Sequence, residues 1–128
     1  MRKLRVGIIG LGMGRHHLKS FQSHPAVEVV ALADPDEARL EEIGAAYNVS
    51  RRYTSAETMF QEEKLDVVSV ATPNCTHKPL SLAAFQAGCH VLCEKPMAMN
   101  AAEGREMLAA AQKAGKRLMI NFSYRFTE

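Results

Sequence analysis

The chain has 128 residues, of which 47% are hydrophobic, and this size and composition suit a single domain with one ordinary core. Its 16 basic residues are nearly balanced by 14 acidic ones, so the overall charge gives no argument for a nucleic-acid or membrane partner. No apolar run approaches the ~20 residues that cross a bilayer, and the basic N-terminus runs into glycines rather than into a secretory signal, so we expect a cytoplasmic protein.

Short runs of β-branched residues alternate along the chain with longer stretches rich in Ala, Leu and Glu, an order typical of parallel strands joined by crossover helices. The pattern predicts strands at residues 4–9, 27–33, 51–53, 67–71, 90–93 and 118–121, and helices at residues 15–23, 35–47, 55–61, 76–87 and 101–114. The apolar run at residues 67–71 suits a strand that is covered on both faces. The predicted fold class is α/β, with a doubly wound, mostly parallel six-stranded sheet.

Several predicted helix ends carry residues that favour them. Pro35 suits the first turn of the second helix, and Asn100 can cap the last helix. Gly88 and Gly115 follow the last turns of two helices, where a left-handed residue is common.

A glycine-rich turn joins the first predicted strand to the first predicted helix. Glycines at this place allow a tight turn, and the free N–H groups of the helix attract a pyrophosphate. Gly10 and Gly12 fit the G-x-G-x-x-G pattern of dinucleotide-binding Rossmann domains, whereas its third position falls on Arg15, with Gly14 one residue early. A tight turn without a ligand remains an alternative.

An acidic residue ends the second predicted strand. Asp34 follows Gly10 at close to the ~20-residue interval expected for the acid that binds the adenosine ribose. Asp36 and Glu37 come next, and no basic residue precedes Arg39, so a 2′-phosphate would be repelled and NAD is favoured over NADP. The alternative is that Asp34 and Asp36 only cap the following helix.

Polar residues also follow the next two long strands, at the sheet edge where ligands gather. One turn reads Ala71-Thr72-Pro73-Asn74-Cys75-Thr76-His77, and the other reads Cys93-Glu94-Lys95-Pro96. Alternatively, His77 is a surface residue at a helix N-terminus, and Glu94 and Lys95 are surface charges at a strand end.

The cysteines give no sign of a disulfide framework or a zinc site. Cys75, Cys89 and Cys93 form an odd set without a C-x-x-C pair, so we expect reduced thiols and no metal site. Cys89 and Cys93 are interpreted as small apolar filler around a buried strand.

Three segments together resemble the Gfo/Idh/MocA (glucose-fructose oxidoreductase, inositol dehydrogenase) family. They are Glu94-Lys95-Pro96 after Val91-Leu92-Cys93, Ala71-Thr72-Pro73-Asn74 with His77, and Asn121 through Tyr124-Arg125-Phe126. The resemblance implies that Lys95 is the catalytic residue beside the nicotinamide and the substrate hydroxyl, and that Glu94 orients the nicotinamide side. It further implies that the cofactor contacts Gly10, Gly12, Met13, Gly14, Thr72, Pro73, Asn74 and His77, with Arg125 near an interdomain cleft.

Members of this family are considerably longer, because a second, sheet-based domain contacts the substrate and supplies an Asp and a His. We therefore expect residues 1–122 to form the dinucleotide-binding domain and residues 123–128 to begin the connection to a C-terminal substrate domain that is missing from this excised or truncated chain. The expected function is NAD-dependent hydride transfer to or from a carbinol carbon of a sugar, inositol or related polyol, in a homo-oligomer, with the chain inactive by itself. The alternative is a non-catalytic NAD-binding sensor or regulatory module.

Overall fold

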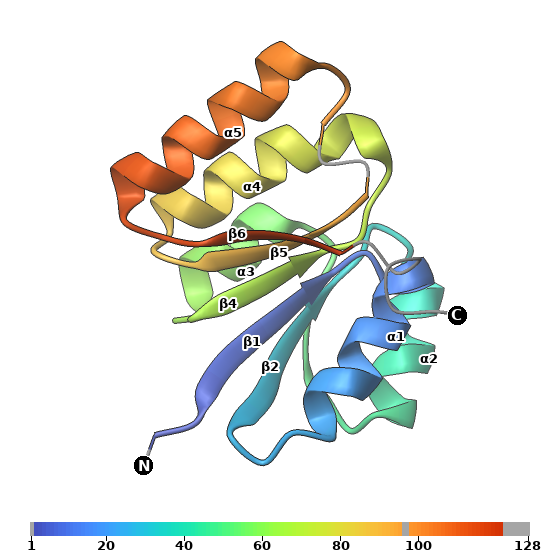
Figure 1. The fold of residues 1–128 in the computed structure, drawn as a ribbon. Coiled ribbons are helices and arrows are strands. Elements are labelled where there is room, and N and C mark those ends of the chain that lie inside the picture. Colours follow the sequence, from blue (N-terminus) through green and yellow to red (C-terminus); the bar gives the residue numbers. More distant parts are fainter. Residues whose placement is uncertain (1, 96–97, 122–128) are drawn as a thin grey trace, which may run out of the picture.

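A computed structural model describes residues 2–95 and 98–121 of the chain, and within these residues one sheet of six strands has helices on both of its faces (Figure 1). The strands are β1 (Leu4–Ile9), β2 (Val27–Ala33), β3 (Arg51–Tyr53), β4 (Val67–Val70), β5 (His90–Glu94) and β6 (Leu118–Asn121). The helices are α1 (Leu11–Gln22), α2 (Glu37–Ala46), α3 (Ala56–Glu62), α4 (His77–Gln86) and α5 (Ala101–Ala114), with a 3₁₀ turn, η1 (Asn74–Thr76), before α4.

The sheet is parallel throughout, with the strand order β3-β2-β1-β4-β5-β6. The chain winds outward in one direction from β1 to β3 and then in the other from β4 to β6, so the direction changes between β1 and β4. Ile9 is in register with Ala33 on one side and with Val70 on the other. The predicted doubly wound sheet is confirmed, and the carboxyl ends of its central strands meet at one edge, where such sheets bind ligands.

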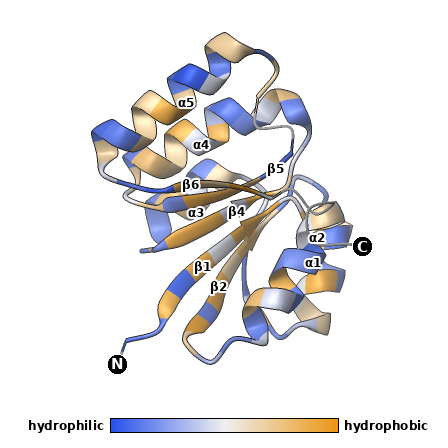
Figure 2. Cartoon of the chain, in the orientation of Figure 1, coloured by the Kyte–Doolittle hydropathy of each residue, from blue (hydrophilic) through white to orange (hydrophobic). Residues whose placement is uncertain are grey.

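Two apolar layers hold the helices to the sheet, as the hydropathy colouring of the strands in Figure 2 indicates. On one face, α1 and α2 pack on β1 and β2 through Val6, Ile8, Leu11, Leu18, Leu32, Leu40 and Ile43. On the other face, α3, α4 and α5 pack through Met59, Val68, Val70, Phe85, Val91, Cys93 and Met107. Within the described ranges, no helix is both long and apolar enough to span a membrane.

Most predicted element bounds agree with the structure to within about two residues, the usual scatter of helix ends. Asn100 caps α5 by accepting a hydrogen bond from the N–H of Glu103 at 2.9 Å, and Gly88 and Gly115 have φ values of 85° and 68° after their helices. The prediction that Pro35 lies in the first turn of α2 is wrong. Asp36 is the N-cap, because its side chain accepts from the N–H of Arg39, and Pro35 therefore lies before the helix.

The start of the first helix is also predicted wrongly. The structure begins α1 at Leu11 rather than at residue 15, directly after Gly10, whose φ of 87° makes the turn in one residue. Gly12 and Gly14 thus lie inside the helix, and the glycine-rich loop is reduced to Gly10 and the first turn of α1.

Candidate functional site

Gly10 brings the ends of β1 and β4 into close contact. A Cβ atom built on Gly10 would lie 2.5 Å from the carbonyl oxygen of Ala71 and 2.9 Å from the side chain of Thr72. Its N–H donates to the carbonyl of Ala33 at 2.9 Å, so the turn is also tied to the end of β2. No residue with a side chain fits here, because both the positive φ and the close approach exclude it.

The other two glycines have different surroundings. A Cβ on Gly14 would lie 2.9 Å from Cγ2 of Ile8, so Gly14 lets α1 pack closely on β1, which is the task of the third glycine in the usual pattern. A Cβ on Gly12 would meet Nη1 of Arg39 at 3.7 Å, an ordinary contact, and Met13 is 56% exposed. The N-terminal turn of α1 is thus accessible to a ligand over Gly12 and Met13, while Gly14 faces the core.

Asp34, which is only 4% exposed, joins the end of β2 to the start of α1. Its Oδ2 accepts from the N–H of Leu11 and its Oδ1 accepts from the N–H of Asp36, both at 2.8 Å. The cap of α2 is therefore Asp36, and Asp34 instead supports the glycine turn. A carboxylate offers about four acceptor positions, so Asp34 retains the capacity to accept from two ribose hydroxyls.

Arg39 is a site residue that the sequence analysis set aside. The first turn of α2 brings its Nη1 to 3.6 Å from Oδ2 of Asp34 and next to Gly12, while its side chain remains 43% exposed. Its position three residues after the N-cap Asp36 could have indicated this role, because one helical turn returns the side chain to the end of β2. A guanidinium at this place can accommodate a 2′-phosphate, which weakens the argument that NADP would meet only repulsion.

A pocket of 340 Å³ opens beside Asp34 at the carboxyl edge of the sheet. Its walls are mostly apolar and come from the ends of β1, β2 and β3, from the start of α3, from the β4–α4 turn and from α4: Ile9, Ala33, Asp34, Pro35, Thr54, Ala56, Thr72, Pro73, Thr76 and Leu80. An apolar slot with a carboxylate on its wall fits a flat heterocycle attached to a sugar with free hydroxyls. The surroundings of Gly12 and Asp34 and this slot therefore suit the adenosine diphosphate part of a dinucleotide.

The β4–α4 turn carries three of the predicted cofactor residues, Thr72, Pro73 and Asn74, and a fourth, His77, begins α4. Thr72 and Pro73 line the pocket, and the hydroxyl of Thr76 lies 2.5 Å from that of Thr72 and 2.6 Å from the carbonyl oxygen of Pro73. Asn74, in η1, is exposed at the same edge. His77 is fully buried beneath the turn, where its Nε2 donates to the carbonyl of Thr72 at 2.8 Å, so the histidine supports the shape of the turn.

At the end of β5, Glu94 and the following Lys95 are partly buried. Oε1 of Glu94 lies 2.5 Å from Nε2 of His17, which reaches it from α1, and Nδ1 of His17 is hydrogen-bonded to the hydroxyl of Ser69 on β4. Sequence reasoning missed His17. Its signal is a polar residue at helical spacing among the buried positions Leu11, Gly14 and Leu18 of α1.

Some predicted site residues lie outside the described ranges. Pro96, Arg125 and the predicted connection at residues 123–128 belong to this group, so their roles stay predictions. In the part of the chain that the structure describes, no group of three or more His, Cys, Asp or Glu side chains is placed to hold a metal ion.

Comparison with known proteins gives matches over nearly the whole chain. D-apiose dehydrogenase of Paraburkholderia graminis is 36% identical over 98% of the chain, and D-glucoside 3-dehydrogenase of Escherichia coli is 38% identical over 96%. The chain spans 34% and 36% of the lengths of these two relatives. A crystal structure of the WlbA dehydrogenase of Bordetella pertussis, in complex with NADH and UDP-GlcNAcA, has a TM-score of 0.89 and 32% identity, with 94% of this chain and 37% of the other covered.

The model of one protein family matches residues 4–122 and is described as an oxidoreductase family with an NAD-binding Rossmann fold. This match covers most of the chain and includes the glycine turn, Asp34 and the Glu94-Lys95 pair. The chain therefore belongs to the Gfo/Idh/MocA family of oxidoreductases with an NAD-binding Rossmann fold.

Proposed function

We propose that this chain is the cofactor-binding part of an NAD-dependent dehydrogenase that moves a hydride between nicotinamide and a carbinol carbon of a sugar, inositol or related polyol. The observation that carries the proposal is that the two predicted halves of the site share one edge of the sheet. Gly12 and Asp34 lie on the β1–β2 side, and Glu94 and Lys95 lie on the β5 side. A dinucleotide bound across the change of direction between β1 and β4 would contact both.

Relatives support the substrate class. The chain is similar to dehydrogenases of D-apiose and of D-glucosides, and also to myo-inositol 2-dehydrogenase of Thermotoga maritima, with which it shares 32% identity over 96% of its residues. These names share a polyhydroxylated substrate. The family resemblance assigns contacts with such a substrate to a second domain, which the greater length of the relatives also supports.

In this proposal, each part of the described chain has a separate task. The N-terminal turn of α1 binds the pyrophosphate through its N–H groups and its dipole, and Asp34 accepts hydrogen bonds from the adenosine ribose. Bound nicotinamide supplies the hydride acceptor. Lys95 holds and moves the proton of the substrate hydroxyl, and Glu94 orients the nicotinamide side of the site.

The test uses NAD and a panel of polyols. We expect the 128-residue chain to bind NAD in calorimetric titration, and the longer protein with its second domain to form NADH with inositols, aldoses or glucosides. NAD binding without turnover on any of these would favour the alternative of a non-catalytic NAD-binding module. Absence of NAD binding would contradict the proposal altogether.

A further inference from the structure

Three polar side chains form a buried chain between α1 and the end of β5. Ser69 on β4 is fully buried, His17 on α1 is 7% exposed, and the side chain of Glu94 is 13% exposed. The imidazole connects the other two, with Nδ1 on the hydroxyl of Ser69 and Nε2 at 2.5 Å from Oε1 of Glu94. Such a chain would be costly to bury unless its members were hydrogen-bonded to one another.

The order of hydroxyl, imidazole and carboxylate is that of a nucleophilic triad, but the position of Ser69 excludes this chemistry. Ser69 lies inside β4, between β1 and β5, where a substrate cannot reach its hydroxyl. A carboxylate can only accept, so Nε2 of His17 donates to Glu94, and the hydroxyl of Ser69 can then donate to Nδ1. The imidazole is hydrogen-bonded at both nitrogens, and its contact with Glu94 is the one that reaches the end of β5.

His17 lies on the helix whose first turn is the proposed pyrophosphate site, whereas Glu94 directly precedes Lys95. The two ends of the proposed site are thus joined by one hydrogen bond between α1 and β5. Its two residues, His17 and Glu94, are 77 positions apart in the sequence. In a doubly wound sheet, the adenosine lies over the first half and the nicotinamide over the second half, which begins at β4.

We propose that His17 is a positioning residue. By holding the carboxylate of Glu94, it fixes the Glu94-Lys95 pair relative to the helix that binds the cofactor phosphates. In this way His17 increases the affinity that the nicotinamide end contributes to cofactor binding. This inference rests on the proposed function, because it concerns the same cofactor. It assigns His17 no contact with the substrate or with the reacting atoms.

The test compares NADH with ADP-ribose, which lacks the nicotinamide, in calorimetric titrations of the 128-residue chain. The quantity of interest is the ratio of the two affinities, because it isolates the nicotinamide end. His17→Asn retains a group near Ser69 but is too short to reach Glu94, and we expect it to lower the ratio roughly 3- to 30-fold, which lies within the range of coupling between contacting residues. The affinity for ADP-ribose should stay nearly unchanged.

Two variants serve as matched controls. His17→Gln places its amide N–H near the position of Nε2 and should keep the ratio close to that of the wild type. Ser69→Ala removes the other contact of the imidazole and leaves the link to Glu94, so it should also keep most of the ratio. If a general loosening of the fold were responsible, Ser69→Ala would lower the ratio as much as His17→Asn does. Should His17→Asn fail to fold, His17→Phe keeps the ring and lacks the donor.

The outcomes separate this inference from the proposed function. If the wild type binds neither ligand, the proposed function fails. If the wild type binds both and His17→Asn or His17→Phe leaves the ratio unchanged, His17 has no positioning role and the inference is overturned. Equal affinity of the wild type for NADH and ADP-ribose would overturn it as well.

Discussion

Asp34 and Arg39, at the end of β2, favour different cofactors. Asp34 can accept hydrogen bonds from the ribose hydroxyls of NAD, whereas Arg39 can pair with the 2′-phosphate of NADP. Asp34 is buried, whereas Arg39 is 43% exposed, so we expect the carboxylate to have the larger effect on cofactor preference. NAD should therefore bind more tightly than NADP. Asp34→Ala should reduce the preference roughly tenfold, because hydrogen bonds to a charged group contribute ~1.5–3 kcal/mol. Calorimetric titration with both cofactors measures it.

Arg39→Ala provides the complementary measurement. Removal of the guanidinium should weaken NADP more than NAD, because only NADP carries the 2′-phosphate. Glu42→Ala, at an exposed position of α2, should leave both affinities unchanged. Equal affinity of the wild type for the two cofactors, or a preference for NADP, would contradict the assigned role of Asp34.

Lys95 should matter to hydride transfer more than to cofactor binding, because a lysine beside the nicotinamide acts on the charge that develops at the substrate oxygen. In a version of the protein that carries the proposed second domain, Lys95→Ala should lower turnover by ~10² to 10⁴, the range for a lost acid-base group, with far less change in NAD affinity. Lys95→Arg should not restore turnover, since a guanidinium cannot release a proton at neutral pH. Steady-state rates within about twofold of the wild type would contradict a catalytic role for Lys95.

The cysteines should differ sharply in reactivity. Burial raises the pKa of Cys93 to about 12 and that of Cys89 to about 11, whereas Cys75 is exposed. The thiolate is the reactive form, so at neutral pH a thiol reagent should label Cys75 quickly and the other two only after denaturation. Counting modified thiols by mass spectrometry, with Cys75→Ser as the control, checks this. Rapid labelling of Cys93 in the native state would contradict its role as core filler.

Residue positions could be predicted from sequence only where a general rule ties them to a strand end. Asp34 and Lys95 follow β2 and β5, and parallel strands bring their carboxyl ends together, so the placement of both residues at one edge of the sheet could be predicted. His17 could not be found in this way, since its partner Glu94 is 77 residues away and nothing local indicates the pairing. Arg39 was not predicted to lie at the site, because it is five residues after Asp34 in the sequence. The first turn of α2 nevertheless brings its guanidinium to 3.6 Å from the carboxylate of Asp34.

The short edge strand β3 is held in place by one buried carboxylate. The side chain of Glu63, directly after α3, is 1% exposed, accepts from Nη1 of Arg51 at 3.0 Å and from the hydroxyl of Tyr53 at 2.5 Å, and lies 3.5 Å from Nη2 of Arg5. The hydrogen bond to Glu63 also raises the pKa of Tyr53. This cluster ties β3 to α3 and β1 at the edge of the sheet opposite the proposed site.

Glu63→Ala should therefore lower the free energy of unfolding by about 1–3 kcal/mol, the usual cost of leaving buried polar groups without a partner. Urea denaturation followed by circular dichroism measures the change. Glu42→Ala removes an acid from an exposed helical position and should change stability by less than about 0.5 kcal/mol. Equal effects of the two substitutions would mean that the cluster does not hold β3.

The start of α1 at Leu11 could not be predicted from local helix propensity. Glycine is a poor helix former, so Gly12 and Gly14 favoured a loop up to Arg15. In the structure, tertiary packing outweighs that preference, since Gly14 lies against Ile8 and the carboxylate of Asp34 accepts from the N–H of Leu11. By contrast, α5 was predicted with its observed bounds, because Asn100 and Gly115 mark its two ends without help from distant residues.

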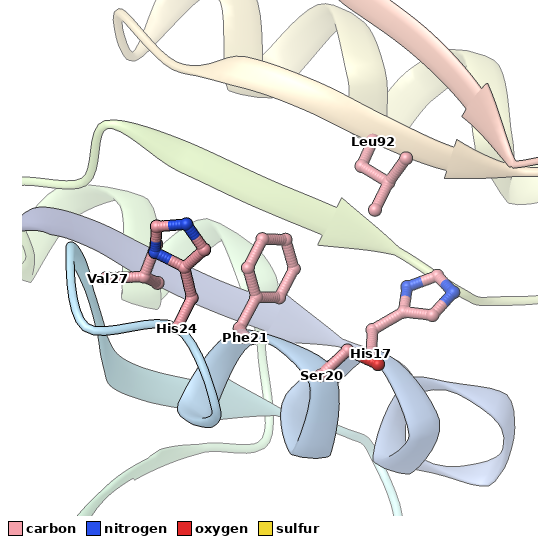
Figure 3. A pocket seen from close by; sticks show the side chains of 6 residues that line it. All are labelled: His17, Ser20, Phe21, His24, Val27 and Leu92. Atoms are coloured by element: carbon pink, nitrogen blue, oxygen red, sulfur yellow. The ribbon is translucent and has the colours of Figure 1, made fainter.

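The two faces of the second half of the sheet are covered unevenly by helices. α4 and α5 lie on one side of β5 and β6 (Figure 1), where Val91, Cys93 and Leu118 join the core. Alternation along the strands directs Leu92 and Met119 to the other side. Met119 is 66% exposed there, and Leu92 borders a pocket of 360 Å³ between β5 and α1 (Figure 3).

We expect the 128-residue chain to self-associate through this apolar face, or to bind an apolar dye on it. A face of this kind is the surface on which a second domain would dock. Sedimentation velocity over a range of concentrations and dye fluorescence measure the two effects, and Met119→Lys should reduce both. A monomer at high concentration that binds no dye would contradict the prediction that this face is an apolar docking surface.

The place of β1 in the sheet has a consequence for the order in which the protein is made. β1 is synthesised before the other five strands of this sheet, yet it becomes a central strand only when β4 pairs with it and the N–H of Ala71 donates to the carbonyl of Ile9 at 2.9 Å. Until β4 has left the ribosome, one edge of β1 has unpaired N–H and C=O groups. Such an exposed strand edge can pair with a strand of another chain. Non-local parallel pairing of this sort is slow. The nascent chain is therefore most prone to aggregation in the interval before β4 pairs with β1.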